Sequence, residues 1–272
     1  MSADRPLGVF DSGIGGLTVL RALRARMPAE DFIYLGDTAR LPYGTKSGES
    51  VVRYSILASD ALVERDIKCL VVACNTASAV ALRALQDRYA PLPVIGVLEP
   101  GAEAACAASA SGRIAVLATE GTVRGGAYQA AIHALRPTAR VIAQACQLFV
   151  ALTEEGWVDG PLVTGIVQRY LEPIFRAPAQ LHPDCLLLGC THFPVLQAVF
   201  SAVVGPSIAI VDSAATTAAV VQRMLGSARL NRDSGTGTMQ LLATDGPARF
   251  ARVGGTFLGE RIDPEAIETV DL

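Results

Sequence analysis

A short buried strand and the polar turn after it are predicted by the stretch Cys69-Leu-Val-Val-Ala-Cys74-Asn75-Thr76-Ala77-Ser78. The apolar run at 70–73 does not alternate with polar residues, which favours a parallel strand covered on both faces. Cys74, Asn75 and Thr76 come at the carboxyl end of this strand, where helix-like sequence also begins. Because ligands bind at the carboxyl ends of strands in open α/β sheets, the Cys74 thiol is placed to meet a substrate.

The same arrangement occurs a second time, in the stretch Cys185-Leu-Leu-Leu-Gly-Cys190-Thr191-His192. In both copies the outer and inner cysteines are five positions apart. We expect Cys69 and Cys185 to be inert core residues, because most buried cysteines behave as small hydrophobes. Cys74 and Cys190 precede polar residues, and we interpret them as functional thiols at equivalent strand ends. The repeat predicts two similar half-molecules that face one cleft.

The composition indicates a globular protein with a sizeable core. The chain has 272 residues, 51% of them hydrophobic, and a formal net charge of −3 without a basic block. Nucleic acid and anionic membranes are therefore poor partners on charge grounds. The sequence has no apolar run of transmembrane length and no signal sequence at its start, so we expect a cytoplasmic protein. Its length allows one large domain or two of ordinary size.

Cysteines, histidines and lysines limit the chemistry further. The six cysteines do not resemble a disulfide framework, and no CxxC pair is present. The three histidines are scattered, so we expect no metal site. Lys46 and Lys68 are the only lysines, which limits Schiff-base chemistry to these two side chains.

Strands and helices alternate along most of the chain. This alternation predicts an α/β protein with doubly wound parallel sheets. We interpret Glu99-Pro100-Gly101 as a hinge between the halves. The predicted strands cover 7–10, 31–35, 70–73, 94–97, 114–118, 141–145, the second cysteine stretch, 207–211 and 238–243. The predicted helices cover 17–27, 49–65, 76–89, 102–110, 161–175, a segment after Pro194, 214–224 and a short segment at 247–253.

Two loops near the N-terminus contain candidate binding residues. The glycine-rich turn at 11–16 precedes a predicted helix and can present backbone N–H groups to an anion. Its spacing excludes a dinucleotide fingerprint, because Thr18 occupies the last glycine position of that motif. The segment 39–46 contains Pro, Tyr and Gly between charged residues, and we interpret it as a lid or a substrate grip.

Two thiols on opposite sides of one bound molecule predict a stereochemical inversion. If Cys74 and Cys190 lie so, one thiolate removes a proton from a carbon and the other thiol returns one to the opposite face. Free cysteine has a pKa of about 8.5, and helix N-termini or neighbouring cations lower it. We expect both thiols to lie at turns that start helices.

The polar residues around the two thiols suit an amino acid. Neutral hydrogen-bonding side chains, which suit a carboxylate, are those of Ser12, Asn75, Thr76 and Thr191. Ionisable side chains, which can tune the thiols or hold an ammonium group, are those of Asp11, Glu154 and His192.

These motifs resemble the cofactor-independent aspartate/glutamate racemase family, and within it the bacterial glutamate racemases. The resemblance covers the chain from residue 7 to about residue 224. The pair of cysteine motifs together with the glycine-rich turn is highly specific. The matching stretches are Phe10-Asp-Ser-Gly-Ile-Gly-Gly-Leu17, Tyr34-Leu-Gly-Asp-Thr38, Pro42-Tyr-Gly44, Ala73-Cys-Asn-Thr-Ala77, Gly96-Val97 with Glu99-Pro100, Gly121-Thr-Val123, Glu154-Glu-Gly-Trp157, Gly189-Cys-Thr-His-Phe-Pro194 and Val211-Asp-Ser213.

The resemblance implies interconversion of L- and D-glutamate without a cofactor, which supplies D-glutamate for peptidoglycan. It implies two α/β domains related by a pseudo-twofold axis, with the active site between them. The first domain is expected to be discontinuous, with residues 1–97 and 209–272, and the second to cover 98–208. Glutamate is then the small-molecule partner, and we also expect a homodimer.

The resemblance also assigns roles to individual residues. By matching position, Cys74 and Cys190 are the two expected bases, with Asp11, Glu154 and His192 assisting them. The residues expected to contact the substrate are Asp11, Ser12, Tyr43, Gly44, Asn75, Thr76, Thr191 and His192.

Three other functions are compatible with parts of this pattern. One is a pyridoxal-phosphate racemase that uses Lys46, with Tyr43 as the opposite base. Another is a sister racemase that acts on aspartate, because cleft size is not readable from sequence. The last is a binding protein that has kept the fold, although intact Cys74 and Cys190 weigh against it.

Overall fold

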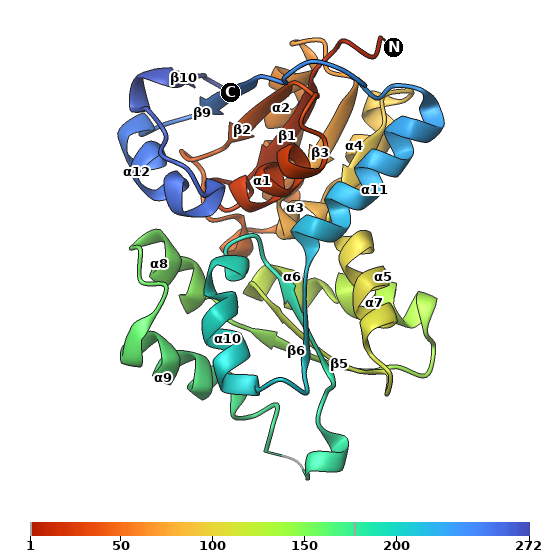
Figure 1. Cartoon of the computed structure of the whole chain (residues 1–272), viewed down its shortest axis with the longest axis vertical. Coiled ribbons are helices and arrows are strands. Elements are labelled where there is room, and N and C mark those ends of the chain that lie inside the picture. The colour runs from red at the N-terminus through yellow and green to blue at the C-terminus, as the bar shows by residue number, and fades with distance from the viewer. Residues whose placement is uncertain (1, 177) are drawn as a thin grey trace.

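A computed structural model describes residues 2–176 and 178–272 and contains two parallel sheets in two lobes (Figure 1). The first sheet has the strand order β10-β9-β2-β1-β3-β4, and the second has the order β6-β5-β7-β8. Every pair of neighbouring strands is parallel. The first sheet contains β1 (Leu7–Asp11), β2 (Phe32–Gly36), β3 (Cys69–Val72), β4 (Val94–Gly96), β9 (Met239–Ala243) and β10 (Ile267–Thr269). The second contains β5 (Arg113–Ala118), β6 (Arg140–Ala145), β7 (Cys185–Gly189) and β8 (Ala209–Asp212).

Helices cover both faces of each sheet. The first lobe consists of the first sheet with α1 (Leu17–Arg26), α2 (Gly48–Val63), α3 (Asn75–Val80), α4 (Leu82–Tyr89), α11 (Ser213–Ala228) and α12 (Pro247–Leu258). The second lobe consists of the second sheet with α5 (Leu98–Ala108), α6 (Glu120–Gly125), α7 (Ala127–Leu135), α8 (Leu148–Glu154), α9 (Gly160–Leu171) and α10 (Gln197–Val204). Short 3-10 helices occur at Tyr43–Thr45, Ala179–Leu181, Phe193–Leu196 and Pro264–Ala266.

The unbroken apolar runs of the cysteine strands follow from this double covering. Successive side chains of a strand point to opposite faces of the sheet. Cys69 and Val71 of β3 therefore pack with α1, α11 and α12, whereas Leu70 and Val72 pack with α2, α3 and α4. Strand β7 is divided in the same way between α5 and α7 on one face and α8, α9 and α10 on the other. The prediction of an α/β fold with parallel strands covered on both faces is confirmed.

The outer cysteines lie where the sequence placed them, inside the two cores. Cys69 and Cys185 are fully buried among hydrophobic side chains. Burial raises the pKa of each thiol to about 12, so both stay protonated at neutral pH. All six cysteines of the chain are free.

The division into two domains stays a proposal, and the strand pairing moves one of its expected boundaries. We propose one domain for each sheet, with the first crossing at residues 97 and 98, where α5 begins. The second crossing was expected after residue 208. Strand β8, however, pairs with β7 along Ala209–Asp212, so these residues belong to the second sheet. The chain returns to the first sheet's layers with α11, which packs on α1, and we place the crossing at residues 212 and 213.

The C-terminal segment is larger than the sequence pattern predicted. A short helix was expected at 247–253, but α12 continues to Leu258 and places its buried face against α1. Strand β10 then adds a further edge to the first sheet, beside β9. No helix in the part of the chain that the structure describes is long and apolar enough to cross a membrane.

The two lobes contact each other through the turns at the carboxyl ends of their strands. Thr76, after β3, has its hydroxyl 3.0 Å from the hydroxyl of Thr119, after β5. The Thr18 hydroxyl of α1 donates a hydrogen bond to the Thr191 carbonyl, after β7, at 3.0 Å. Since ligands bind at this edge of a parallel sheet, the contact region between the lobes is where a site is expected.

Candidate active site

Cys74 lies directly after β3 and caps the N-terminus of α3. Its sulfur accepts a hydrogen bond from the Ala77 amide at 3.4 Å, and its thiol donates one to the Ser12 hydroxyl at 3.4 Å. The residue is only 5% exposed. Burial and the Asp11 charge raise the pKa of Cys74 to about 12, although the Ser12 and Ala77 hydrogen bonds oppose them. Cys74 is therefore a thiol at neutral pH, and a cation placed beside it would favour the thiolate.

Cys190 lies directly after β7 and has a different neighbour. Its sulfur is 3.9 Å from Nδ1 of His192, and Nε2 of His192 is 3.1 Å from Oε1 of Glu154 at the end of α8. Burial alone would lower the pKa of His192, but its contacts with Cys190 and Glu154 outweigh this and raise the pKa to about 10. The imidazole is therefore a cation at neutral pH, and it is placed to hold or return a proton at the Cys190 sulfur.

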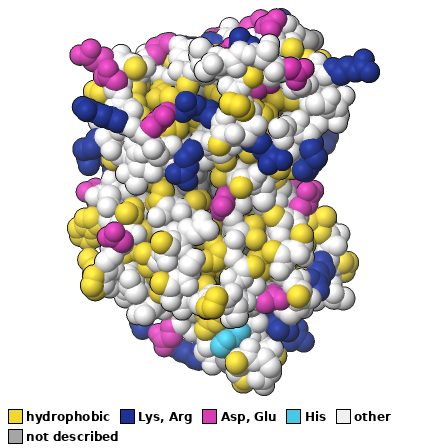
Figure 2. Space-filling view, in the orientation of Figure 1, with side chains coloured by type: hydrophobic (Ala, Val, Ile, Leu, Met, Phe, Trp, Pro, Cys, Tyr) yellow, Lys and Arg dark blue, Asp and Glu magenta, His cyan; other side chains and the backbone are white. Residues whose placement is uncertain are grey.

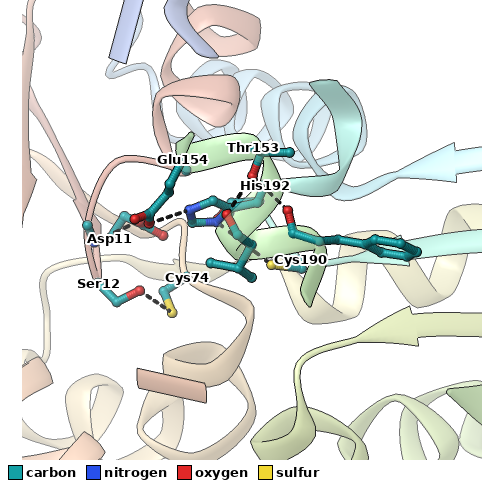
Figure 3. Close-up of polar contacts among 12 residues, drawn as sticks. Asp11, Ser12, Cys74, Thr153, Glu154, Cys190 and His192 are labelled. Carbon is teal, nitrogen blue, oxygen red and sulfur yellow. Dashed lines mark hydrogen bonds and ion pairs between the residues drawn. The ribbon is translucent and has the colours of Figure 1, made fainter. Parts of the chain in front are cut away.

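The carboxylate of Glu154 balances this cation. Burial alone would raise the pKa of Glu154, but the interactions with His192 and Arg249 outweigh it and hold the pKa below its ordinary value. Cys190, His192 and Glu154 thus form a connected row in the second lobe (Figure 3).

The two thiols have unlike surroundings, which the sequence repeat did not predict. Cys74 caps an α-helix, as expected, but Cys190 is followed by a turn and the 3-10 helix Phe193–Leu196. In Figure 3 Ser12 points to Cys74, while His192 lies beside Cys190. Cys190 is among the groups that raise the pKa of Cys74, so the two sulfurs are electrostatic neighbours.

Asp11 and Asn75 each keep one polar atom without a protein partner. Asp11, at the end of β1, is fully buried and accepts a hydrogen bond from the Gly13 amide through Oδ2 at 2.9 Å. Asn75 accepts a hydrogen bond from the Tyr128 hydroxyl at 2.5 Å. Within 2–176 and 178–272, Oδ1 of Asp11 and Nδ2 of Asn75 are buried without a hydrogen-bond partner. Buried polar groups are rarely left unpaired, so an acceptor and a donor are available to a ligand.

The charge state of Asp11 depends on its neighbours. Burial raises the pKa of Asp11 above its ordinary value, although His192 and the backbone N–H groups of Gly16 and Gly13 act in the opposite direction. An ammonium group beside Oδ1 would stabilise the carboxylate form.

A cluster of hydroxyl groups adjoins Asn75. Thr76 Oγ1 lies 3.0 Å from Thr119 Oγ1 and 3.3 Å from Thr122 Oγ1, and the last two are 3.1 Å apart. Gly44 lies against this cluster, because a Cβ there would be 2.7 Å from Cβ of Thr119. Hydroxyl groups that can rotate are well suited to donate to a carboxylate.

Thr119 and Thr122 are candidate site residues that the sequence pattern did not single out. Thr119 directly follows β5, so the rule that singled out the residues after β3 and β7 would have found it. Thr122 lies one helical turn later, at the start of α6.

Tyr43 and Thr191 are held by protein contacts of their own. The Tyr43 hydroxyl donates a hydrogen bond to Oδ2 of Asp37 at 2.6 Å and is buried. Burial and Asp37 raise the pKa of Tyr43 strongly, which does not suit the base that the pyridoxal-phosphate alternative requires. Thr191 lies against Gly15, and its carbonyl accepts from Thr18. Contact of Tyr43 and Thr191 with a substrate stays a prediction.

No metal-binding arrangement accompanies these residues. Among the described residues, no group of three or more His, Cys, Asp and Glu side chains is placed to hold a metal ion. What the arrangement offers is two thiols, a charged row beside one of them, and unpaired donor and acceptor atoms.

Comparisons with known proteins agree with this chemistry. Residues 17–221 match the family model of the Asp/Glu/hydantoin racemases. A glutamate racemase of Geobacter metallireducens is 48% identical over 95% of this chain and 94% of its own length. The crystal structure of a Francisella tularensis glutamate racemase in complex with D-glutamate has a TM-score of 0.90 and 32% identity, covering 99% of this chain and 98% of that chain.

A third relative has been crystallised with an amino acid that carries a leaving group. The glutamate racemase from Thermus thermophilus in complex with β-chloro-D-alanine has a TM-score of 0.89 and 40% identity, covering 100% of this chain and 99% of that chain. With one cysteine turn at a strand end in each of two parallel-sheet lobes, and with matches of this extent, the chain belongs to the Asp/Glu/hydantoin racemase family.

Proposed function

We propose that this chain interconverts L- and D-glutamate, with Cys74 and Cys190 as the two acid/base groups and with no cofactor. The observation that carries the proposal is the pairing of two thiols from different lobes beside two unpaired polar atoms of opposite kind. An α-amino acid brings one cation and one anion. Its ammonium group suits Oδ1 of Asp11, and its carboxylate suits Nδ2 of Asn75.

Each turnover moves one proton onto a thiolate and another off a thiol. One sulfur takes the α-proton, and the electron pair of the broken C–H bond stays on the α-carbon. The thiol on the opposite face then gives its proton to that pair, and the new C–H bond has the inverted configuration. The enzyme ends with the proton on the other sulfur, ready for the reverse reaction.

The substrate itself helps to activate Cys74. The nearby Asp11 charge and burial keep Cys74 protonated in the free protein. An ammonium group bound at Asp11 offsets that charge and so favours the thiolate. On the other side, His192 and Glu154 are in position to support proton transfer at Cys190.

Glutamate, rather than another amino acid, is favoured by the hydroxyl cluster. The cluster of Thr76, Thr119 and Thr122 lies next to Asn75 and provides donors for a second carboxylate. We propose that Ser12, Tyr43, Gly44 and Thr191 line the same substrate. The relatives named above are glutamate racemases, one of them solved with D-glutamate. D-Glutamate made here would supply peptidoglycan synthesis.

Circular dichroism of a glutamate solution tests the proposal. L-Glutamate incubated with the purified protein, without any added cofactor, should lose its ellipticity completely as it becomes the racemate. L-Aspartate under the same conditions should change far more slowly. A constant glutamate signal would favour a binding protein, and faster loss with aspartate would favour the sister racemase.

We further propose a homodimer that works in the cytoplasm. Support for a dimer comes from apolar side chains exposed on α8, α9 and the turn between them, namely Leu148, Trp157 and Leu162. Figure 2 shows hydrophobic side chains gathered over this part of the second lobe. A large exposed apolar patch is typical of an interaction surface. Sedimentation of the wild type and of Leu162→Glu tests it, since the variant should shift toward the monomer.

A further inference from the structure

Helix α12 reaches the candidate site from the first lobe at two points. The Phe257 ring meets the His192 ring edge to face, with centroids 5.2 Å apart and an interplanar angle of 77°. Nη2 of Arg249 lies 3.0 Å from Oε2 of Glu154. The cation therefore comes from one lobe and the anion from the other.

The carboxylate of Glu154 is divided between two cations. Its Oε1 faces His192 at 3.1 Å and its Oε2 faces Arg249. The Glu154 side chain is 9% exposed, whereas the Arg249 side chain is 44% exposed. A buried carboxylate is costly unless each oxygen is paired. Arg249 thus fixes the one oxygen that His192 does not use.

We propose that Arg249 is a positioning residue for proton transfer at Cys190, because it holds the Glu154 carboxylate in the orientation that aligns His192 with the thiol. This inference rests on the two-thiol function proposed above and extends it to a residue outside the cysteine motifs. Without Arg249, the carboxylate can rotate and accept a proton more readily. His192 then loses the fixed partner that orients its ring toward Cys190.

Loss of Arg249 is expected to affect proton abstraction only on the side of the substrate that faces Cys190. The groups that face His192 are Cys190, Glu154 and Asp11, and those that face Glu154 are His192 and Arg249. Cys74 has Ser12, Ala77 and Asp11 as its main neighbours instead. A change at Arg249 should therefore weaken proton abstraction by Cys190 and leave abstraction by Cys74 nearly intact.

Racemisation rates alone cannot reveal this asymmetry. L- and D-glutamate have equal free energies in water, so every variant must have the same kcat/KM in both directions. Elimination from 3-chloroglutamate separates the two halves, since it needs abstraction only. The thiolate takes the α-proton, the C–H electron pair forms a C=C bond, and chloride leaves with its own pair. The enamine then hydrolyses to 2-oxoglutarate and ammonium.

The experiment measures 2-oxoglutarate release from the α-L and α-D forms of 3-chloroglutamate. The wild type is compared with Arg249→Gln, Arg249→Lys and Arg252→Gln. The Cys74→Ser variant identifies the form that Cys190 uses, as the one it still converts. Arg249→Gln should slow that form about fivefold, the scale expected for a partly exposed ion pair, and change the other form less than about twofold. Arg249→Lys keeps the cation and should recover most of the rate.

Arg252 is the matched control, because it is an exposed arginine one turn further along α12 with no ion pair among the described residues. Arg252→Gln should release 2-oxoglutarate at the wild-type rate from both the α-L and the α-D form of 3-chloroglutamate. Equal slowing of both forms by Arg249→Gln would assign Arg249 to general packing between the lobes and overturn the inference. Unchanged rates with both forms would overturn it as well. If the wild type neither racemises glutamate nor eliminates chloride, the proposed function itself fails, which is a different result.

Discussion

Gly15 lies directly against the imidazole ring of His192. A Cβ at position 15 would be 2.4 Å from Nδ1 of His192 and 2.5 Å from Oγ1 of Thr191. Atoms this close overlap, so a side chain at position 15 would have to displace the ring. The absence of a side chain at Gly15 thereby lets His192 keep its place beside Cys190. Cys190 lies 175 positions after Gly15 in the sequence.

Gly15→Ala is predicted to impair catalysis more than folding. The added methyl group pushes His192 away from Cys190, and misplacement of a catalytic group by about 1 Å can cost up to about a hundredfold in rate. We expect kcat/KM for glutamate to fall by roughly tenfold or more, measured by circular dichroism.

Gly165→Ala is the matched control for this substitution. Gly165 is in α9, and no atom lies within 4 Å of a Cβ built there. Alanine should leave the activity unchanged and stabilise the helix by roughly 0.5–1 kcal/mol. A fully active Gly15→Ala enzyme would mean that His192 need not keep its observed position.

The stability of the protein is predicted to depend on pH through His192. Its pKa is raised from 6.5 to about 10 in the folded chain, so the folded state keeps a proton that the unfolded state loses. The stabilisation is therefore complete below pH 6.5 and is lost as the pH rises toward 10. Its slope is at most ~1.4 kcal/mol per pH unit for one proton.

Urea unfolding between pH 6.5 and 8 checks this prediction. Burial raises the pKa of the Cys74 thiol to about 12, so the buried thiols add a loss of their own only as the pH approaches the ordinary cysteine value of about 8.5. His192→Gln should flatten the decline in unfolding free energy within the window. Identical slopes for the wild type and the variant would show that His192 does not carry the raised pKa.

Strands and turns that have local sequence signals could be predicted from the sequence. Contacts between segments that are far apart in the chain could not. The unbroken apolar runs predicted β3 and β7, and the polar residues after them marked Cys74 and Cys190. The family resemblance led us to expect that residues 209–272 belong to the first domain, but Ala209–Asp212 pairs with β7. This segment has no local feature that selects one sheet over the other.

The role of α12 could not be read from sequence for a similar reason. Arg249 and Phe257 lie in a segment that contributes little to the family resemblance. They meet Glu154 and His192 only because the two lobes fold against each other. Thr119, unlike Arg249 and Phe257, could have been predicted from the sequence, because it directly follows β5 as the two cysteines follow β3 and β7.

Activity is predicted to survive removal of metals and small cofactors. The proposed chemistry uses only thiols and their polar neighbours. Exhaustive dialysis against a chelator should leave the racemisation rate unchanged, measured by circular dichroism before and after. A loss that an added metal ion restores would contradict the prediction. A visible aldimine band that borohydride abolishes would instead support pyridoxal-phosphate chemistry at Lys46.

The last prediction concerns the division of labour between the two thiols. Serine has nearly the shape of cysteine but is a far weaker acid, so it is a poor source of a base near neutral pH. Inversion uses both groups in every turnover. Cys74→Ser and Cys190→Ser should therefore both lose most of their racemase activity.

The two serine variants should differ in elimination from 3-chloroglutamate, where only abstraction is needed. Each enantiomer presents its α-hydrogen to one side, so each variant should still convert one form and fail with its mirror image. The family resemblance predicts that Cys74 acts on the D form and Cys190 on the L form. Cys74→Ser should then eliminate chloride from the L form, and Cys190→Ser from the D form. If both variants convert the same form, the thiols do not face opposite sides of the substrate, and an inversion that passes a proton from one sulfur to the other has no geometric basis.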